Sequence, residues 1–194
     1  MNLGKRIFDV MFSLLGLMLL WPLFILIAIL IKVKMPGPVL FHQRRVGRYG
    51  KPFTIHKFRS MTVGHGGSTV SVKGENRITP LGAWMRKYKF DELPELWNVL
   101  IGEMSFVGPR PDTAEFYDRL RGEEKLILEL RPGITGPASL KYAKEEEILS
   151  TVSDPYRYND EVIWPDKVRM NLDYYYHRTF FLDIKIILKT LFRW

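Results

Sequence analysis

Two adjacent carboxylates, Asp91 and Glu92, have the residue types and setting best suited to chemistry in this chain. They precede the step Leu93-Pro94, where proline disfavours the α conformation for the residue before it and suits the first turn of a new helix. The pair is therefore expected just before a helix N-terminus, whose positive end stabilises anions and favours a bound phosphate. A solvated helix cap without catalytic function would contain the same residue types.

A second segment, Ser105–Pro111, supports the catalytic interpretation. Within an otherwise apolar run it holds Gly108, two prolines and Arg110, which predicts a rigid loop that presents the arginine. A guanidinium on a rigid loop suits bidentate recognition of phosphate. The two segments together predict metal and phosphate chemistry.

Three motifs give the chain a resemblance to a known family. They are Asp91–Leu100, Met104–Pro111 and Arg131–Gly136. In this order and spacing they resemble the bacterial sugar transferase family. Its small members are monotopic phosphoglycosyl transferases, which move a sugar phosphate from a nucleotide diphosphate sugar onto a polyprenyl phosphate. The resemblance extends from the N-terminal hydrophobic segment almost to Trp194.

The resemblance also implies further site residues. Lys57 and Arg59 match a basic motif of the family and are expected to line the active site near the substrate diphosphate, although a solvated basic edge remains an alternative. Arg131 is a second candidate, beside Arg110, for contact with phosphate or nucleotide. The family pattern places Asp183 near the metal and the two carboxylates. A Mg²⁺ cofactor held by Glu92 and Asp183 is therefore expected.

The mechanism that these residues suggest uses a covalent intermediate. Asp91 attacks the sugar-bearing phosphorus of a UDP-sugar and expels UMP, and polyprenyl phosphate then attacks the resulting ester. This would be a first membrane step of bacterial glycoconjugate assembly, at the cytoplasmic face of the inner membrane. Two alternatives stay open: a membrane-anchored, Mg²⁺-dependent nucleotide-sugar hydrolase, and a basic lipid-binding membrane protein without catalytic activity.

The length and composition of the chain limit which domains, metal sites and binding partners are expected. The 194 residues suggest one domain with its own core, and the absence of cysteine excludes disulfides and thiolate metal sites. A net charge of +8 fits an anionic partner, such as nucleic acid, anionic lipid or a nucleotide substrate. Because the aromatic residues are concentrated in hydrophobic segments rather than interleaved with basic ones, nucleic acid is not expected as a partner.

The hydrophobic segment Val10–Ile31 carries no charge and has about the ~20 residues that a membrane-spanning helix needs. Basic residues flank it on both sides, so both ends are expected on the cytoplasmic side. Pro22 predicts a bend, and the family resemblance implies a re-entrant hairpin; a straight or kinked span is the alternative. Family members often have serine before this proline, whereas this chain has Trp21. The expected division is a membrane helix over 1–35 and a cytoplasmic catalytic domain over 36–194.

The expected fold class is α-rich α+β. Strand-favouring runs at 39–43 and 53–58 predict a short β-hairpin, and Thr79-Pro80 predicts a helix start. Residues 113–130 read as an amphipathic helical region broken near Gly122. Residues 178–194 have apolar side chains at helical spacing and a basic row, which fits a helix at the membrane interface, although packing on the core would give the same pattern.

Overall fold

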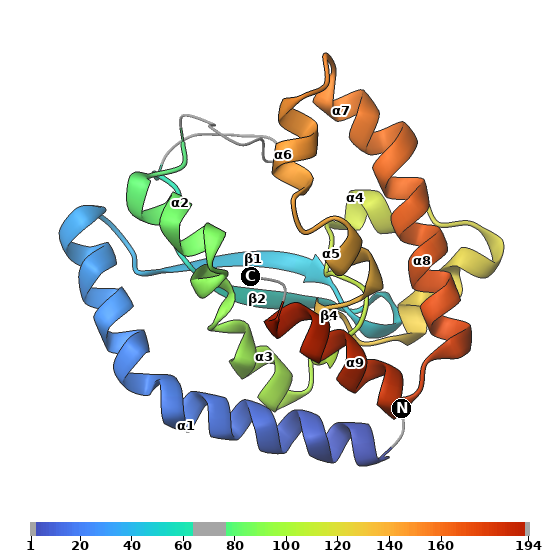
Figure 1. The fold of residues 1–194 in the computed structure, drawn as a ribbon, viewed down its shortest axis with the longest axis horizontal. Coiled ribbons are helices and arrows are strands. Elements are labelled where there is room, and N and C mark those ends of the chain that lie inside the picture. The colour runs from blue at the N-terminus through green and yellow to red at the C-terminus, as the bar shows by residue number, and fades with distance from the viewer. Residues whose placement is uncertain (1–2, 64–76, 193–194) are drawn as a thin grey trace.

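The computed structural model describes residues 3–63 and 77–192, whose arrangement Figure 1 shows. A long N-terminal helix runs along one side of a domain made of short helices, a β-hairpin and a pair of parallel strands. The described chain is helix-rich with small sheets, as the sequence predicts.

The N-terminal helix α1 (Leu3–Lys34) has 32 residues, contains Pro22 and changes direction partway along (Figure 1). Proline removes one helical hydrogen bond and crowds the preceding turn, which accounts for a bend. The helix is long and apolar enough to cross a membrane. Most of its apolar side chains are not buried by the rest of the described chain, so the helix fits a membrane anchor. The re-entrant hairpin stays a prediction.

Polar side chains in the first turns of α1 fasten it to the domain. Arg6 donates hydrogen bonds of 2.7 and 2.8 Å to two carbonyls near the end of α3 (Glu95–Ile101). Lys5 donates to a carbonyl of β3 (Ser105–Val107) at 2.9 Å, and Asp9 accepts from a backbone N–H of the same strand at 3.1 Å. Because these contacts satisfy backbone groups, they fix the orientation of α1 against the domain.

The predicted β-hairpin is confirmed and its strands are longer than expected. β1 (Leu40–Val46) pairs antiparallel with β2 (Pro52–Phe58). Phe53 and Ile55 are buried beneath it, and Lys57 follows two residues later on the same face. The hairpin therefore points Lys57 into the domain.

The two glycine-containing motifs meet in a second, parallel pair of strands. β3 pairs with β4 (Gly133–Thr135), and each strand is three residues long, too short for a periodic pattern to have predicted it. A Cβ on Gly133 would lie 2.1 Å from the nitrogen of Gly108, and a Cβ on Gly136 would lie 2.3 Å from the oxygen of Gly108. Glycine at these positions therefore lets the backbones of the two motifs approach closely.

The helix before the carboxylate pair agrees with the sequence prediction. α2 (Pro80–Lys87) begins after Thr79, whose hydroxyl accepts a hydrogen bond of 3.0 Å from the backbone of Gly82. Pro80 occupies the first turn, where its missing N–H costs nothing. The predicted N-cap and helix are both confirmed.

Most of the remaining helical elements are short. In the predicted amphipathic region the structure has α4 (Ala114–Tyr117) and a 3₁₀ helix, η3 (Gly122–Glu129), so the predicted break at Gly122 is present. The other helical elements before the last helix are η1 (Arg48–Gly50), η2 (Phe90–Glu92), α5 (Pro137–Lys141), α6 (Glu145–Ser150), α7 (Pro155–Tyr158), the π-helical turn η4 (Asn159–Ile163) and α8 (Trp164–His177).

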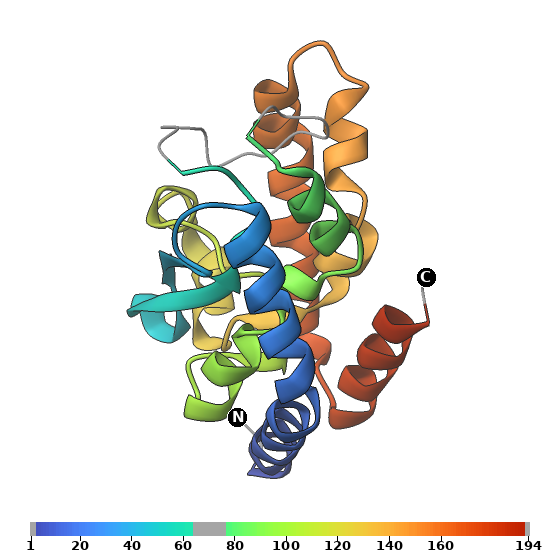
Figure 2. The ribbon, with the colours of Figure 1, turned by 90° about the vertical axis from the view of Figure 1, so that its left-hand side faces the viewer.

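The last described helix, α9 (Phe180–Leu191), lies at the same end of the molecule as the N-terminal part of α1, away from α6 and α7 (Figures 1 and 2). The rings of Phe8 and Phe180 contact each other edge to face, with centroids 5.6 Å apart. Ile186 is buried, whereas Phe181 is 85% and Phe192 82% exposed. The predicted helix at 178–194 is present through Leu191, and residues 193–194 lie outside the described part. The exposed apolar side chains of the N-terminal part of α1 and those of α9 therefore occur at one end of the protein.

Arg59 connects the end of α1 to the hairpin and is expected to be structural. Its buried guanidinium donates to the carbonyl of Pro36 at 2.9 Å and also to that of Met35. Arg59→Gln should lower the free energy of unfolding by about 1–3 kcal/mol, because buried carbonyls lose a charged donor. Thermal unfolding in detergent measures this, with exposed Arg44→Gln as the control. An unchanged midpoint together with weaker donor binding would instead support the substrate-binding role predicted from the sequence.

Candidate active site

Asp91 and Glu92 lie in the single turn η2, between α2 and α3. Lys89, just before the turn, has a left-handed backbone with φ of 57°, which redirects the chain after α2. Both carboxylate residues are buried, with 6% and 7% of their surface exposed. The pair precedes α3 as predicted, but it faces the interior of the domain, so it is not a solvated cap.

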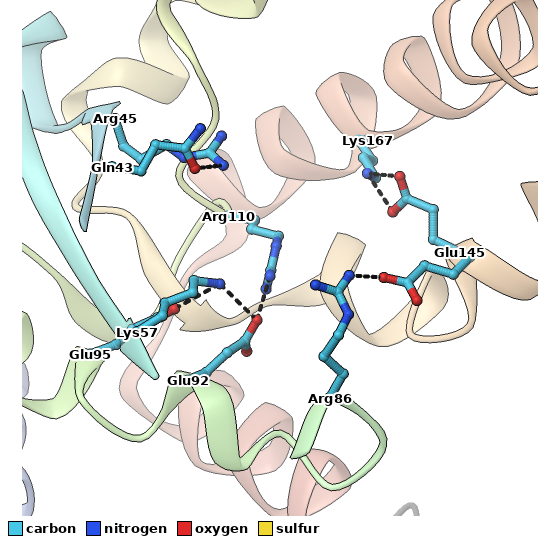
Figure 3. A network of polar contacts seen from close by, with 10 residues as sticks. Gln43, Arg45, Lys57, Arg86, Glu92, Glu95, Arg110, Glu145 and Lys167 are labelled. Carbon is cyan, nitrogen blue, oxygen red and sulfur yellow. Dashed lines mark hydrogen bonds and ion pairs between the residues drawn. The ribbon is translucent and has the colours of Figure 1, made fainter. Parts of the chain in front are cut away.

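Glu92 is held between two cations from separate segments (Figure 3). Lys57 of β2 lies 3.0 Å from its Oε1, and Arg110, beyond β3, bonds to the same oxygen. Burial alone would raise the pKa of Glu92, but Arg110 and Lys57 outweigh it and hold this pKa well below its usual range. Glu92 is therefore an anion at neutral pH, and the structure brings the predicted residues Lys57, Glu92 and Arg110 together.

Glu95, in the first turn of α3, adds a third buried carboxylate to this cluster. It is 1% exposed, and its Oε1 lies 3.1 Å from Nζ of Lys57. Burial raises the pKa of Glu95 to about 7, with Lys57 opposing the rise and Glu92 adding to it. Burial would lower the pKa of Lys57, but Glu92 and Glu95 outweigh it and raise that pKa. Lys57 is thus a stable cation shared by two glutamates.

Asp91 has the least satisfied carboxylate of the three. Its Oδ1 is buried and has no hydrogen-bond partner among the described residues. Burial raises the pKa of Asp91, and the neighbouring charge of Glu92 raises it further. A buried, unpaired carboxylate oxygen is costly unless a ligand uses it. Asp91 Oδ1 is accordingly a candidate atom of this site for contact with a substrate or a metal.

The two carboxylates fit a magnesium ion of the kind that substrate phosphates complete. Both cations contact Oε1 of Glu92, which leaves Oε2 for a further ligand, and Asp91 offers its unpaired Oδ1. Mg²⁺ commonly takes one or two carboxylates together with phosphate oxygens and water. No group of three or more His, Cys, Asp or Glu side chains suited to a metal occurs within residues 3–63 and 77–192. A cation here would therefore depend on oxygens from the substrate.

The structure does not bring three other predicted residues into contact with this cluster. Arg59 binds the carbonyls after α1, and Arg131 donates to the carbonyl of Gly102 at 2.7 Å. Asp183 accepts from Tyr174 and pairs with Lys5, each at 2.5 Å, in a separate cluster between α1 and α9. Magnesium ligation shared by Glu92 and Asp183 stays a prediction, and these contacts do not support it.

Sequence reasoning missed several residues around the site. Arg86 on α2, labelled in Figure 3, lies in the electrostatic neighbourhood of Asp91. Its guanidinium bonds to the carboxylate of Glu146 on α6. Glu95 was missed although the buried residues of α3 include it with Leu96, Asn98 and Val99. An acid on an otherwise buried helix face was the signal that could have found it. Gln43 and Arg45 of β1 were also missed, because their orientation depends on the register of the hairpin.

Comparisons with known proteins agree with these motifs. The model of a family described as bacterial sugar transferase matches residues 1–194. The chain is 37% identical to a UDP-glucose:undecaprenyl-phosphate glucose-1-phosphate transferase of Xanthomonas campestris pv. campestris, over 98% of this chain and 38% of that protein. It is 34% identical to a UDP-N-acetylgalactosamine-undecaprenyl-phosphate N-acetylgalactosaminephosphotransferase of Aeromonas hydrophila, over 96% of this chain and 42% of that protein.

A third relative is more completely covered. A UDP-glucose:undecaprenyl-phosphate glucose-1-phosphate transferase of Caulobacter vibrioides is 35% identical over 98% of this chain and 69% of its own length. The chain spans about two fifths of the length of the first two relatives. Since the family model matches from the first residue to the last and includes all three motifs, the chain belongs to the bacterial sugar transferase family.

Proposed function

We propose that the chain transfers a sugar 1-phosphate from a UDP-sugar to undecaprenyl phosphate, a polyprenyl phosphate, and releases UMP. The names of its relatives describe reactions of this kind, with glucose or N-acetylgalactosamine as the sugar. The observation that carries the proposal is the buried, unpaired Oδ1 of Asp91. It belongs to the residue next to Glu92, whose carboxylate forms ion pairs with Lys57 and Arg110. Phosphoryl transfer depends mainly on such positioning and charge balance.

In the first half-reaction Asp91 is the nucleophile. Its Oδ1 forms a bond to the sugar-bearing phosphorus, the bond from that phosphorus to the bridging oxygen breaks, and the electron pair leaves with UMP. Asp91 must be ionised for this attack. Lys57, Lys89 and Arg86 lie where their charges lower its pKa against the effect of burial. The product is a phosphosugar ester on Asp91.

Lys57 and Arg110 position Glu92 and lie where they would balance the charge of the transferred phosphoryl group. Glu92 and the phosphate oxygens of the substrate would hold Mg²⁺, which when bound supplies positive charge against the developing negative charge of those oxygens. Asp183 is left out of this ligand set because Lys5 and Tyr174 already bind it. Glu95 is a positioning residue that keeps Lys57 beside Glu92.

In the second half-reaction an oxygen of undecaprenyl phosphate attacks the same phosphorus, and the carboxylate of Asp91 leaves. The product is an undecaprenyl diphosphate sugar. The acceptor is a lipid, which agrees with the exposed apolar side chains along α1 and on α9. We place the chain at the cytoplasmic face of the bacterial inner membrane, with α1 entering and leaving on that face.

The covalent intermediate can be tested by intact-protein mass. Purified chain mixed with Mg²⁺ and UDP-glucose or UDP-N-acetylgalactosamine, without lipid acceptor, should gain the mass of one sugar phosphate. Asp91→Asn should show no gain and should lose roughly 10⁴-fold of turnover, because the amide is not a competent nucleophile. Exposed Asp118→Asn is the control. Release of UMP that requires the acceptor, with no adduct, would contradict the covalent route, and release of free sugar phosphate to water would indicate a hydrolase.

The raised pKa of Glu95 predicts a pH-dependent stability. Its pKa is about 7 in the folded chain against an ordinary 4.5, so the folded state binds more protons between these values. The free energy of unfolding should therefore fall as pH rises from about 5 to about 7, by roughly 3 kcal/mol. The amide of Glu95→Gln cannot ionise, so the free energy of unfolding of this variant should lack this fall with pH. Thermal midpoints across this pH range measure it, with exposed Glu115→Gln as the control; parallel profiles for wild type and Glu95→Gln would contradict the assignment.

The membrane arrangement can be tested by thiol labelling, because the chain contains no cysteine. Leu3→Cys and Lys34→Cys place single thiols at exposed positions at the two ends of α1. A membrane-impermeant maleimide should label both in inverted vesicles and neither in intact spheroplasts, because basic residues flank both ends. Labelling of either position from the periplasmic side would establish a true span.

A further inference from the structure

Gln43 and Arg45 lie on the face of the hairpin that also carries Lys57. In the register of the hairpin, Gln43 is opposite Ile55 and Arg45 is opposite Phe53, both of which are buried. Alternate residues of a strand share a face, so Lys57 projects from this same side. Figure 3 shows Gln43 and Arg45 reaching from β1 toward Arg110. This pair therefore borders the carboxylate cluster.

The charge of Arg45 has no contacting carboxylate. Among the described residues its guanidinium makes one hydrogen bond, from Nη2 to Oε1 of Gln43 at 2.6 Å, and no ion pair. Its Nε is buried without a partner. Burial lowers the pKa of Arg45, Asp112 opposes this and Arg110 adds to it. A partly buried arginine with an unused donor is costly unless an anion binds it.

The guanidinium of Arg45 has the donor arrangement that suits a phosphate. An arginine presents donors in a rigid planar fork, which matches two oxygens of a phosphate. Gln43 fixes the plane of this fork by accepting from Nη2, and Nε stays available. The strand is in turn fixed to the segment that follows Arg110, because the N–H of Val46 donates to the carbonyl of Asp112 at 3.0 Å. Arg45 and Arg110 are thus held as neighbours.

We propose that Arg45, oriented by Gln43, binds the nucleoside-linked phosphate of the sugar donor, the phosphate that leaves as the nucleoside monophosphate. This inference rests on the proposed transferase function and adds a subsite to it. Lys57 and Arg110 contact Glu92, where the attacked phosphorus would lie, whereas Arg45 lies beyond Arg110 on β1. A diphosphate lying along these residues would place its two phosphates at these two groups of cations.

The subsite has a chemical consequence for the first half-reaction. When the bond between the attacked phosphorus and the bridging oxygen breaks, the electron pair remains on the oxygen of the departing monophosphate. That phosphate gains negative charge as it leaves. A preorganised guanidinium at this place stabilises the developing charge without reorganising. The same contact would also retain the product, so the monophosphate should be a competitive inhibitor.

The test is direct binding of UMP to the purified full-length chain by titration calorimetry, with no sugar donor or lipid acceptor. Arg45→Gln should weaken UMP binding by about tenfold or more, the size of one charge-assisted contact. Gln43→Ala should weaken it by a smaller factor, because the guanidinium remains but loses its orienting acceptor. Arg44→Gln, which changes the neighbouring arginine on the opposite face of β1, is the matched control and should bind UMP as wild type does.

A second measurement needs no variant and covers the case in which Arg45→Gln does not fold. Phenylglyoxal modifies accessible arginines, and peptide mass spectrometry should show that UMP protects Arg45 and leaves Arg44 reactive. Unchanged UMP affinity in Arg45→Gln, no protection of Arg45, or no UMP binding by wild type would each overturn the subsite. The adduct on Asp91 distinguishes the two proposals, since it would still form if the transferase function holds and the subsite alone is wrong.

Discussion

The buried contact of Glu92 with Lys57 and Arg110 is the interaction on which the rest of the site depends. Three carboxylates, Asp91, Glu92 and Glu95, lie in or beside this cluster, and the cations Lys57 and Arg110 contact Glu92 and Glu95. Burial raises the pKa of Asp91 and of Glu95 and the charge of Glu92 adds to both rises, whereas Arg110 and Lys57 hold the pKa of Glu92 low. Under the proposed function, this cluster would take up a metal cation together with an anionic substrate, as metal-assisted phosphoryl transfer requires.

The sequence predicted the site residues whose placement depends on neighbouring residues in the chain. It did not predict the role of side chains whose surroundings come from distant segments. Asp91, Glu92 and the helix after them follow from one proline, and the hairpin with Lys57 follows from strand propensity. The sequence motifs also contained Arg59 and Arg131, but both use their guanidinium groups on backbone carbonyls. A charged residue of a motif can support the fold rather than contact the substrate. The residue type alone does not distinguish a structural arginine from a substrate-binding one; the carbonyls that surround the guanidinium must also be known. For Arg45, the surroundings of the guanidinium depend on the register of the hairpin.

The glycines of the second and third motifs have a structural cause that links fold and chemistry. Gly108 lies against Gly133 and Gly136 so closely that any Cβ would overlap backbone atoms. This contact closes the β3–β4 pair, and Arg110 follows two residues after Gly108. The side chains of α1 that donate to β3 and α3 then connect the same unit to the apolar helix. Hydrogen bonds from side chains of α1 to backbone carbonyls therefore fix the position of the carboxylate cluster relative to this helix.

The proposed covalent route places a geometric demand on the cations beside the leaving group. In a phosphoryl transfer the attacking and departing oxygens lie roughly in line on opposite sides of phosphorus. UMP must then leave on the side opposite Asp91, and the acceptor phosphate, which later displaces Asp91, must approach from that same side. Both groups carry a phosphate, and both need the same compensation of charge at the same place. A cation held along β1 next to Arg110 would serve each half-reaction in turn, so one set of fixed charges suffices for a nucleotide that departs and a lipid that arrives.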